Sequence, residues 1–600
     1  MVVTPASDPP SEPTDPTAPF VQAIVSGLAH VLSDLGAPLP PATVLERLNV
    51  EGGPEGDVAF PTHRAAATVR RPPNEFAQEV AAKFPPQHRL RAVVAKGAFI
   101  NFTFDPVQLT ATTLELALAR GPNYGHRPAS GAPGCVEHTS ANTTGPFHIG
   151  RVRNAIIGDT LARVMRAAGS PVTTQYYVDD MGRQASMITW IWAKPRAEWP
   201  APVRESVDGK EVEGEKDDAR WGRPYPAVSA YLKEHPDAQA EVAAVVREIE
   251  LGHAPAQHRE IARSILGGML TSLARLDIRF DEFVWESDFL RDGSVERVLE
   301  RMHHAPHAVR EENGAWAIDA SSYGLPQEST KVIFQRADGT SLYVLRDVAY
   351  HEAKFARFDR VIDVLGQDHQ LHARTLDALL AELGDPRTPE YLIYQDMTVP
   401  DGGRMSTRRG SAVWLDQLYA EAVERARREV VARREDLSEG EVDRIAEAVA
   451  AGALRYHIVR VAPEKPVVFR WEDALSFEGR SGPFVQYSYA RASSVLRKSG
   501  VGEGPFPFDA QQLGHPEELA LVRIVARWPR TVQYASRTMH VQSLAAYAHD
   551  LADQFNRFYH AVPVLRSDAE RASRIALVAA VRHTLGSALE LLGIPRLETM

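Results

Sequence analysis

The stretch EHTSANTTGPFHIGR, residues 137–151, combines residue types suited to holding a charged ligand. Glu137 opens it, and His148 and Gly150 stand just before a segment with helical spacing. Free N–H groups and the dipole at a helix N-terminus favour anions, phosphate above all. The glycine would let a flat base or a phosphate approach the backbone, and the histidine would add a donor. Taken alone, HIG is more typical of an ordinary strand-to-helix turn with a surface histidine.

A second stretch, DGGRMSTRRG at residues 401–410, is a basic loop flanked by glycines. Arg404, Ser406 and Arg408 would offer donors and cations to phosphate groups. The glycines at both ends leave the backbone of such a loop free to move. In isolation, the same composition is as typical of a solvated basic turn.

The pattern around the first stretch predicts the elements that position it. Residues 131–142 indicate a strand entering a loop, residues 150–169 place apolar side chains close to one helical face, and residues 171–180 indicate the next strand. This order predicts a parallel sheet, and such sheets bind ligands beyond the carboxyl ends of their strands. The first stretch is expected at that edge.

Composition excludes several classes of protein. With 600 residues, 44% hydrophobic and 24% charged, the chain is expected to fold as several soluble globular domains. The single cysteine, Cys135, excludes a disulfide within the chain and a Cys-based zinc cluster, and it fits a reducing cytoplasmic setting. No apolar run is long enough for a membrane span. The net charge of −11 argues against a general nucleic-acid coat protein but leaves room for a local basic groove.

Shifts in pattern along the chain predict five parts. The Pro-rich, Ser-rich and Thr-rich start lacks the features of a secretory signal and predicts a disordered tail. After about residue 415 the chain reads as amphipathic helices to its end. The predicted parts are a tail at 1–20, a small α+β domain at 21–118, a parallel-sheet domain at 119–420 with an insertion at about 184–320, connecting helices at 421–480 and a helical domain at 481–600.

The combined motifs closely resemble class I aminoacyl-tRNA synthetases, and more narrowly the arginyl-tRNA synthetase family. The segments EHTSANTTGPFHIGRVRNAIIGDT, YYVDDMGRQ and GRMSTRRG carry the resemblance, with HIGR at the place of the HIGH signature and RMSTR at that of KMSKS. KGAFINFTF, SGPFVQYSYARASSVLRK and QFNRFYHAVPVL also match the family, so the resemblance runs from about residue 90 to the C-terminus. It implies a multidomain α/β protein with a Rossmann-type catalytic domain and an all-helical anticodon-binding domain.

The resemblance also implies a two-step reaction. The carboxylate of arginine attacks the α-phosphate of ATP, and the terminal adenosine of tRNA-Arg then takes the arginyl group. Such sites act by positioning and by stabilising negative charge, without a nucleophilic side chain. The implied partners are L-arginine, tRNA-Arg and ATP with Mg²⁺ as a substrate complex. The enzyme is expected to be a cytoplasmic monomer that holds no metal of its own and needs bound tRNA before it activates arginine.

Residue by residue, the resemblance assigns two overlapping sets to the nucleotide. The catalytic set is His148, Gly150, Arg151, Arg404, Ser406 and Arg408. The ATP-binding set is Gly145, Phe147, His148, Gly150, Gly366, Asp368, His369 and Met405. Three positions depart from the family signatures, because arginines replace the second histidine of HIGH and both lysines of KMSKS. A guanidinium still pairs with phosphate, but its reach and geometry differ from those of lysine.

Recognition of arginine requires fixed carboxylates, because the guanidinium is planar, always charged and carries five donors. The resemblance assigns this task to Glu137, Tyr343 and Asp347, and the α-amino and carboxylate groups to Ser140, Asn142 and Gln367. Simpler interpretations remain open. Glu137 could bond local N–H groups, and Asp347 could pair with Arg346 or with a helix N-terminus.

The helical domain is predicted to contact tRNA through Tyr487, Tyr489 and Arg491, with aromatics stacking on bases and cations meeting phosphates. The same aromatics have helical spacing, which is also typical of core positions. His369 and His372 have a spacing that could ligate a metal, but no third ligand is evident. Three other functions stay open: a synthetase for another amino acid, a non-catalytic tRNA-binding paralogue and a nucleotidyltransferase of the same superfamily.

Overall fold

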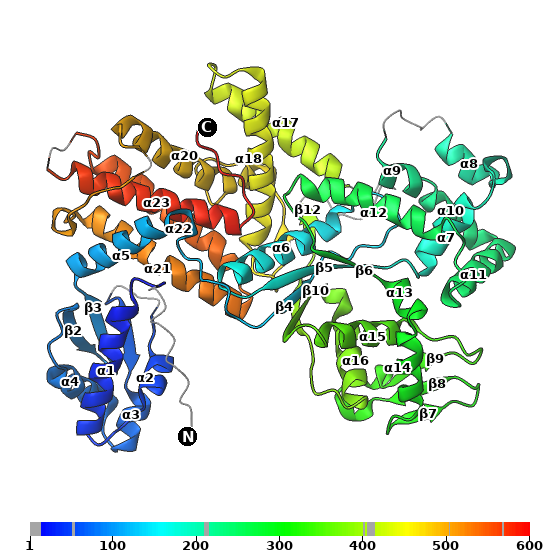
Figure 1. Ribbon diagram of the computed structural model, residues 1–600, viewed down its shortest axis with the longest axis horizontal. Coiled ribbons are helices and arrows are strands. Elements are labelled where there is room, and N and C mark those ends of the chain that lie inside the picture. Colours follow the sequence, from blue (N-terminus) through cyan, green and yellow to red (C-terminus); the bar gives the residue numbers. More distant parts are fainter. Residues whose placement is uncertain are drawn as a thin grey trace, which may run out of the picture.

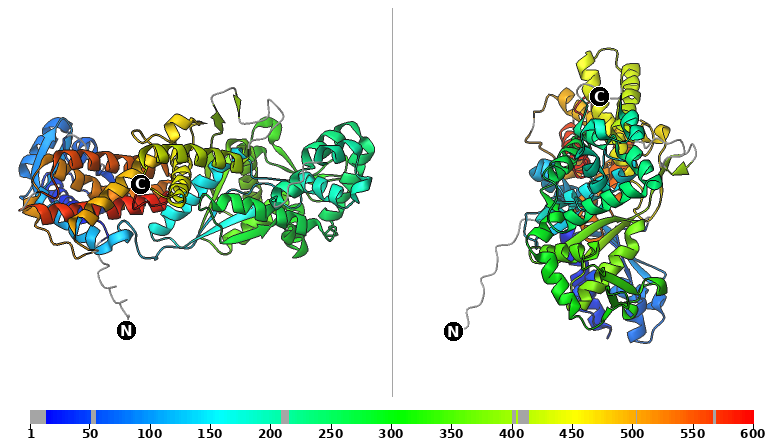
Figure 2. Two further views of the ribbon diagram at one scale, coloured as in Figure 1. Left: turned by 90° about the horizontal axis from the view of Figure 1, so that it is seen from above. Right: turned by 90° about the vertical axis from the view of Figure 1, so that its right-hand side faces the viewer.

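The computed structural model describes residues 14–50, 55–208, 215–399, 414–502, 504–566 and 569–600, and the backbone of Gly403–Arg404. The molecule is elongated (Figures 1 and 2). The N-terminal domain and the C-terminal helices lie together at one end, the parallel sheet lies in the middle, and helices α7–α11 lie at the other end. No helix among the described residues is long and apolar enough to cross a membrane.

The N-terminal domain is α+β, as predicted. Its strands form an antiparallel sheet in the order β1-β3-β2, and residues 90–104 form two of these strands, which turn at Lys96 and Gly97. Its elements are α1 (Ala18–Asp34), α2 (Pro41–Arg47), β1 (Val58–Pro61), α3 (His63–Thr68), α4 (Pro73–Lys83), β2 (Leu90–Lys96) and β3 (Phe99–Phe104). The next helix, α5 (Pro106–Arg120), leaves this domain and packs on the C-terminal helices α21 and α23.

The predicted tail at 1–20 is too long. Helix α1 begins at Ala18, and Asp15 accepts hydrogen bonds from the backbone N–H and hydroxyl of Thr17. The guanidinium of Arg530, on helix α21, pairs with the same aspartate at 2.8 Å. The prolines of this segment suggest disorder, but the hydrogen bonds of Asp15 to Thr17 and its ion pair with Arg530 hold the chain in place.

The central sheet is parallel throughout, which confirms the predicted βαβ unit. Its order is β11-β10-β4-β5-β6, and helix α6 (Val152–Ala167) connects β4 to β5. The strands are β4 (Gly134–Glu137), β5 (Val172–Val178), β6 (Glu282–Trp285), β10 (Arg360–Gly366) and β11 (Glu390–Tyr394). Register places Glu137, the last residue of β4, directly beside Asp363 on β10.

The predicted insertion at 184–320 is wrong as a single unit, because it contains a strand of the central sheet. Strand β6 pairs in parallel with β5, so the chain leaves the sheet twice. The first excursion is α7 (Arg183–Trp192), α8 (Ala201–Val207), α9 (Asp217–Gly222), α10 (Tyr225–Glu234), α11 (Pro236–Glu250) and α12 (His258–Ala274). The second is α13 (Glu286–Arg291), α14 (Ser294–His303) and the antiparallel strands β7 (Ala308–Arg310), β8 (Trp316–Asp319) and β9 (Lys331–Gln335). A strand of four residues between helices gives too short a pattern to predict.

The rest of the chain is mostly helical, as predicted. Helices α15 (Tyr343–Phe355) and α16 (Gln370–Glu382) flank β10. A small sheet then joins β12 (Met397–Val399) to β13 (Gly403–Arg404) and β14 (Val467–Val468). The remaining helices are α17 (Leu415–Arg433), α18 (Glu439–Val459), α19 (Trp471–Ala474), α20 (Gly482–Ser499), α21 (Pro516–Thr538), α22 (Gln542–Ala561) and α23 (Arg571–Leu591).

Helix α9 presses on the loop between β4 and α6. A Cβ atom at Gly222 would lie 2.3 Å from the Cα of Gly145 and 2.7 Å from the carbonyl oxygen of Thr144. The ammonium of Lys216, just before α9, lies 2.6 Å from Asp416 at the start of α17. The first excursion therefore contacts both the loop between β4 and α6 and the start of α17.

The close approach at Gly222 gives a test of this packing. Gly222→Ala is expected to lower the free energy of unfolding by about 1–3 kcal/mol, because the methyl group has no space against a backbone that must move. Gly267→Ala is the matched control: Gly267 lies inside helix α12, and nothing stands within 4 Å of its Cβ position. This control should stabilise by about 0.5–1 kcal/mol through helix propensity. Thermal unfolding measures both, and equal effects of the two changes would contradict the packing described.

Candidate active site

Two cavities meet at the carboxyl ends of β4, β5 and β10. The acidic pocket, of about 610 Å³, is lined among others by Glu137, Asp179, Glu286, Asp347 and Asp363. The loop pocket, of about 530 Å³, is lined among others by Gly145, His148, Gln184, Arg223 and Trp414. Asn142 and Arg151 line both. A ligand with a cationic end and an anionic end could therefore lie across the junction.

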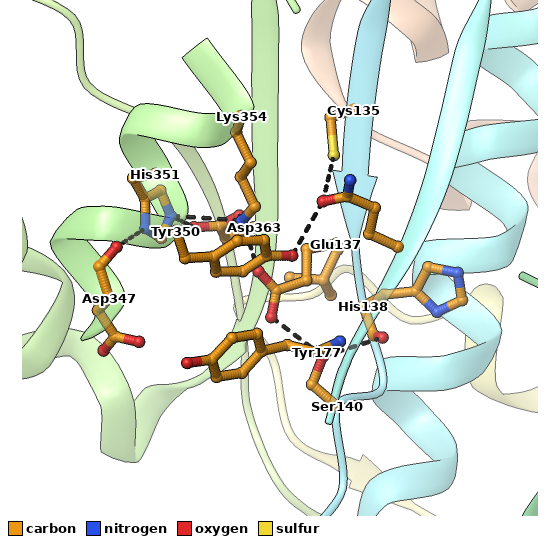
Figure 3. Close-up of polar contacts among 12 residues, drawn as sticks. Cys135, Glu137, His138, Ser140, Tyr177, Asp347, Tyr350, His351, Lys354 and Asp363 are labelled. Carbon is orange, nitrogen blue, oxygen red and sulfur yellow. Dashed lines mark hydrogen bonds and ion pairs between the residues drawn. The ribbon is translucent and has the colours of Figure 1, made fainter. Parts of the chain in front are cut away.

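Glu137 stands at the centre of the acidic pocket (Figure 3). One carboxylate oxygen accepts a hydrogen bond from the hydroxyl of Ser140 at 3.0 Å, and the other lies 2.5 Å from the ammonium of Lys354. Both oxygens therefore have partners within the protein. The carboxylate is held in one orientation, as recognition of a planar cation requires.

The turn after β4 holds an unusual backbone. Thr139 and Ser140 have φ of 74° and 36°, in the left-handed region that residues other than glycine seldom adopt. The amide of Thr139 donates to the side chain of Asn154 at 2.6 Å, and Ser140 accepts from the amide of Tyr177 at 3.1 Å. Neighbouring strands and helix α6 thus maintain this strain, and such strain is typical of functional sites. The turn directs Ser140 and Asn142 into the acidic pocket.

A buried network lies behind Glu137. The ammonium of Lys354 is 2.7 Å from Asp363, and His351 bonds the other oxygen of that carboxylate at 2.8 Å. Burial disfavours both charges, but their mutual attraction prevails: the pKa of Lys354 is raised, and that of Asp363 is lowered by Lys354 and His351. Both groups are therefore ionised at neutral pH.

Asp347 lies on helix α15 and forms an ion pair with His372 of helix α16. The alternative pairing with Arg346 is wrong, because Arg346 pairs with the buried Glu286. Burial disfavours the imidazolium of His372, but the bond to Asp347 outweighs it and raises the pKa of His372 above its ordinary value. Tyr343 begins α15, with 56% of its surface exposed and its ring 5.7 Å from that of His372.

Tyr177 offers an unused polar atom to the acidic pocket. Its ring stacks on Tyr350 with centroids 4.6 Å apart, and its hydroxyl is buried without a hydrogen-bond partner among the described residues. Burial, together with the charges of Glu286 and Asp347, raises the pKa of Tyr177 well above its ordinary value. The neutral phenol can donate a hydrogen bond to a group in the pocket or accept one from it.

His148, which lines the loop pocket, and Gly150 form the entrance of helix α6. The amide of Gly150 donates to Nδ1 of His148 at 3.0 Å, within the 3₁₀ turn Ile149–Arg151. This bond leaves the proton of the neutral ring on Nε2. Burial and the nearby charge of Arg151 lower the pKa of His148, so the ring is neutral at pH 7. His148 is thus a donor positioned at a helix N-terminus.

The structure gathers most of the predicted ligand-binding residues. The acidic pocket receives Glu137, Ser140, Asn142, Arg151, Tyr343, Asp347, Gly366 and His369, and the loop pocket receives Asn142, Gly145, His148 and Arg151. Of the basic loop, Met405, Ser406 and Arg408 lie outside the described residues, and Arg404 is described only as the backbone of β13.

Three predicted residues lie elsewhere. Phe147 is buried in the core with 1% of its surface exposed, so only its backbone can meet a ligand. Gln367 and Asp368 line a separate hollow with Arg374 and Asp377. These two residues follow β10 in the 3₁₀ turn Gln367–His369, and their hollow adjoins the acidic pocket, with which it shares Ala373 and Tyr391.

Sequence analysis missed Lys354, Asp363, His351 and Tyr177. A signal existed for the lysine, since its spacing of seven residues from Asp347 puts both charges on the same face of α15. A charge at such a position requires a buried partner. The partners come from β4 and β10, which are distant in sequence.

The described residues contain one group with metal-ligand spacing. The ligand atoms of Glu137, His351 and Asp363 lie within 4.8 Å of one another. The ammonium of Lys354 already lies against all three, which disfavours a second cation there. His369 and His372 do not form a site with this group, because His372 pairs with Asp347.

The predicted tRNA contacts separate into exposed and buried residues. Tyr487 and Arg491 line a basic groove of about 780 Å³, in which the guanidinium lies over the rings of Tyr487 and Tyr559. Other cations of the groove are Arg434, Arg497, Lys498 and Arg566. Tyr489 is only 5% exposed and donates to Glu598 at 2.9 Å, so it is a core residue and does not stack on a base.

Comparisons with known proteins agree along the whole chain. A family model described as "Arginyl tRNA synthetase N terminal domain" matches residues 22–104, "tRNA synthetases class I (R), catalytic domain" matches 114–471, and "DALR anticodon binding domain" matches 485–600. The arginine–tRNA ligase of Methanocella arvoryzae is 41% identical, over 90% of this chain and 92% of the relative. That of Methanothermobacter thermautotrophicus is also 41% identical, over 96% and 98%. The solved arginyl-tRNA synthetase of Thermus thermophilus superposes with a TM-score of 0.80 at 29% identity, covering 97% of this chain and all of that one.

The Asp347–His372 pair predicts how binding of a guanidinium compound depends on pH. Below the raised pKa of His372 the imidazolium occupies Asp347 and competes with the ligand, and above it the neutral ring releases the carboxylate. Affinity for arginine should therefore rise as pH increases through that pKa, by at most about tenfold per pH unit because one proton is released. Calorimetric titration of arginine from pH 6 to pH 9 measures it. His372→Gln should flatten the profile, and a flat wild-type profile would contradict the competition.

Proposed function

The chain belongs to the arginine–tRNA ligase family of class I aminoacyl-tRNA synthetases, and on that premise we propose which of its residues carry out the ATP-dependent ligation of L-arginine to tRNA-Arg. The observation that carries the assignment is the junction of the two pockets at Asn142 and Arg151. A guanidinium in the acidic pocket and phosphates at the entrance of α6 would bring the carboxylate of arginine to the α-phosphate of ATP.

Asp347 is the principal carboxylate for the guanidinium. Displacement of His372 would free an oxygen at the edge of the pocket, whereas both oxygens of Glu137 already have protein partners. The edge of the Glu137 carboxylate and the hydroxyl of Tyr177 would receive the remaining N–H groups. Tyr343, beside His372, would cover the face of the bound cation.

The other end of arginine would lie toward helix α6. Ser140 and Asn142 line the pocket there and would bind its α-amino and carboxylate groups. Gln367 is left out of this assignment because its side chain lines a neighbouring hollow.

The loop pocket would take the phosphates of ATP. His148, through Nε2–H, and the N-terminus of α6 would donate to them, and Gly145 and Gly150 would allow close approach. Gly366 and His369, at the end of β10, would lie against the nucleoside. Mg²⁺ would enter with ATP as part of the substrate. From the sequence, Arg404, Met405, Ser406 and Arg408 would close over the phosphates.

The chemistry then requires no nucleophilic side chain. A carboxylate oxygen of arginine attacks the α-phosphorus, the bond to the β-phosphate breaks, and diphosphate leaves. The 2′-hydroxyl of the terminal adenosine next attacks the carbonyl carbon of the adenylate, and AMP leaves. Arg151, which lines both pockets, is positioned to neutralise charge that develops between them.

The groove around Tyr487 and Arg491 is the proposed contact with the anticodon. Its cations would bind phosphates of the tRNA, and its exposed tyrosines would stack on unpaired bases of the anticodon loop. The N-terminal domain lies at the same end of the molecule and would bind another part of the same tRNA. The enzyme is proposed to act as a cytoplasmic monomer.

Aminoacylation of total tRNA with each amino acid tests the proposal, and arginine alone should be ligated. Asp347→Asn should raise the KM for arginine about 100-fold, because the loss of charge-assisted hydrogen bonds costs about 3 kcal/mol. Glu137→Gln should also impair arginine use, since it removes charge from the same pocket. Asp208→Asn, at an exposed ion pair outside both pockets, is the matched control and should behave as wild type.

Two outcomes would overturn the proposal. Undiminished charging with arginine in both pocket variants would remove the assignment of the acids. Tight binding of tRNA-Arg by the wild type without any charging would instead indicate a non-catalytic tRNA-binding protein.

A further inference from the structure

We propose that Lys354 permanently occupies a compact-cation site inside the acidic pocket and thereby excludes substrates that carry an ammonium group. Its own ammonium would fill the place that the side chain of lysine or ornithine needs, and it would leave only positions suited to a planar guanidinium. The inference rests on the proposed function, because it concerns the choice of amino acid.

The geometry around Lys354 is that of a filled binding site. Its nitrogen lies 2.5 Å from Glu137, 2.7 Å from Asp363 and 3.3 Å from Nε2 of His351. The ring of Tyr350 covers it, with the centroid 4.0 Å away. Two carboxylate oxygens accept from the ammonium and an aromatic face covers it, while Nε2 of His351 donates to the other oxygen of Asp363. No substrate cation could add to this arrangement without displacing Lys354.

Lys354 and a ligand in the acidic pocket reach the carboxylates from different sides. Glu137, His351 and Asp363 line the acidic pocket, whereas Lys354 reaches them from helix α15 with 1% of its side chain exposed. Figure 3 shows its side chain descending on Asp363 and Glu137 from that helix. A ligand entering the pocket therefore meets the carboxylates from the opposite side and finds their compact site already taken.

Without Lys354 the site would attract another cation. The carboxylates of Glu137 and Asp363 each have an oxygen within 4.8 Å of the other, and without Lys354 they would repel in a region nearly closed to water. A small cation from solution would relieve that repulsion. The ammonium at the end of a lysine or ornithine side chain is such a cation, with the same hydrogen-bonding capacity as the group it would replace.

Asp347 and Tyr177 remain available to the guanidinium when the compact site is filled. Asp347 is bonded to a histidine that ligands can displace, and the hydroxyl of Tyr177 has no partner among the described residues. The pocket thus offers separated acceptors to the five N–H donors of a guanidinium. The position that would suit an ammonium best is already filled by Lys354. Selection between arginine and lysine then has a repulsive component as well as an attractive one.

Two substitutions with different volumes test the inference. Lys354→Ala empties the site, and Lys354→Met removes the charge but keeps most of the volume. Both should lower kcat/KM for arginine at least tenfold in aminoacylation of tRNA-Arg. Only Lys354→Ala should recover activity with millimolar methylammonium, and only it should gain ornithine or lysine in ATP–diphosphate exchange with tRNA present. Tetramethylammonium, which has no N–H donors, is the matched salt control.

Lys331→Ala is the matched protein control, because Lys331 pairs with Glu311 at the surface outside the pocket. It should keep wild-type kinetics in every salt. A thermal-unfolding series runs in parallel. Methylammonium should raise the midpoint of Lys354→Ala above its value in tetramethylammonium, and the other proteins should show no such difference. This measurement remains informative if the alanine variant is too unstable for kinetics.

Three results would overturn the inference. These are wild-type arginine kinetics in Lys354→Ala, recovery of Lys354→Met as large as that of Lys354→Ala, and absence of any methylammonium effect on the activity or unfolding of the alanine variant. After any of these results the proposed function would still hold, provided that the wild-type protein ligates arginine to tRNA-Arg. If the wild type failed to charge arginine, the function would fail, while the unfolding series would still report whether Lys354 fills a cation site.

Discussion

The register of two parallel strands imposes the main electrostatic constraint on this site. Glu137 ends β4 directly beside Asp363 on β10, so two carboxylates lie side by side at the edge of the sheet. Neighbouring strands are only about 4.8 Å apart, and like charges at that separation in a buried place cannot both persist without a cation. Lys354 supplies the cation, and helix α15 must pack where its side chain can reach them. The orientation of the acidic pocket therefore follows from the pairing of β4 with β10.

At the same edge of the sheet, the protein favours a cationic group on one side and an anionic group on the other. Acids predominate on the side of α15, where a ligand would reach Asp347 by displacing His372. On the other side, the N-terminus of α6, the N–H of His148 and the guanidinium of Arg151 favour anions. Arginine is itself cationic at one end and anionic at the other. The charges of the site thus match the direction in which that substrate must lie before its carboxylate can attack a phosphate.

The parts of the fold that are regular over ten residues or more could be predicted from the sequence. Residues 150–169 gave helix α6 because its apolar side chains and its stop signals agree, and the strands on either side follow from that unit. Strand β6 could not be predicted, because four residues between helices carry no period. For the site, the motifs indicated Glu137 and His148, whereas Lys354 depends on pairing between strands far apart in sequence. Tyr489 shows the opposite limit, since helical spacing alone does not tell a core tyrosine from an exposed one.

A buried arginine joins the catalytic sheet to the C-terminal helices. Arg455 on α18 is fully buried, donates to the carbonyl oxygens of Leu592 and Leu276 at 2.6 Å, and pairs with Asp159 on α6. A guanidinium enclosed in this way needs every partner in place, because an unpaired buried charge would cost several kcal/mol. Helix α6, which follows His148 and its 3₁₀ turn, is therefore packed as one unit against the bundle that carries the basic groove. If a large ligand displaced the bundle, the force would act on α6 directly. A movement of α6 would then change the position of Arg151, which lines both pockets.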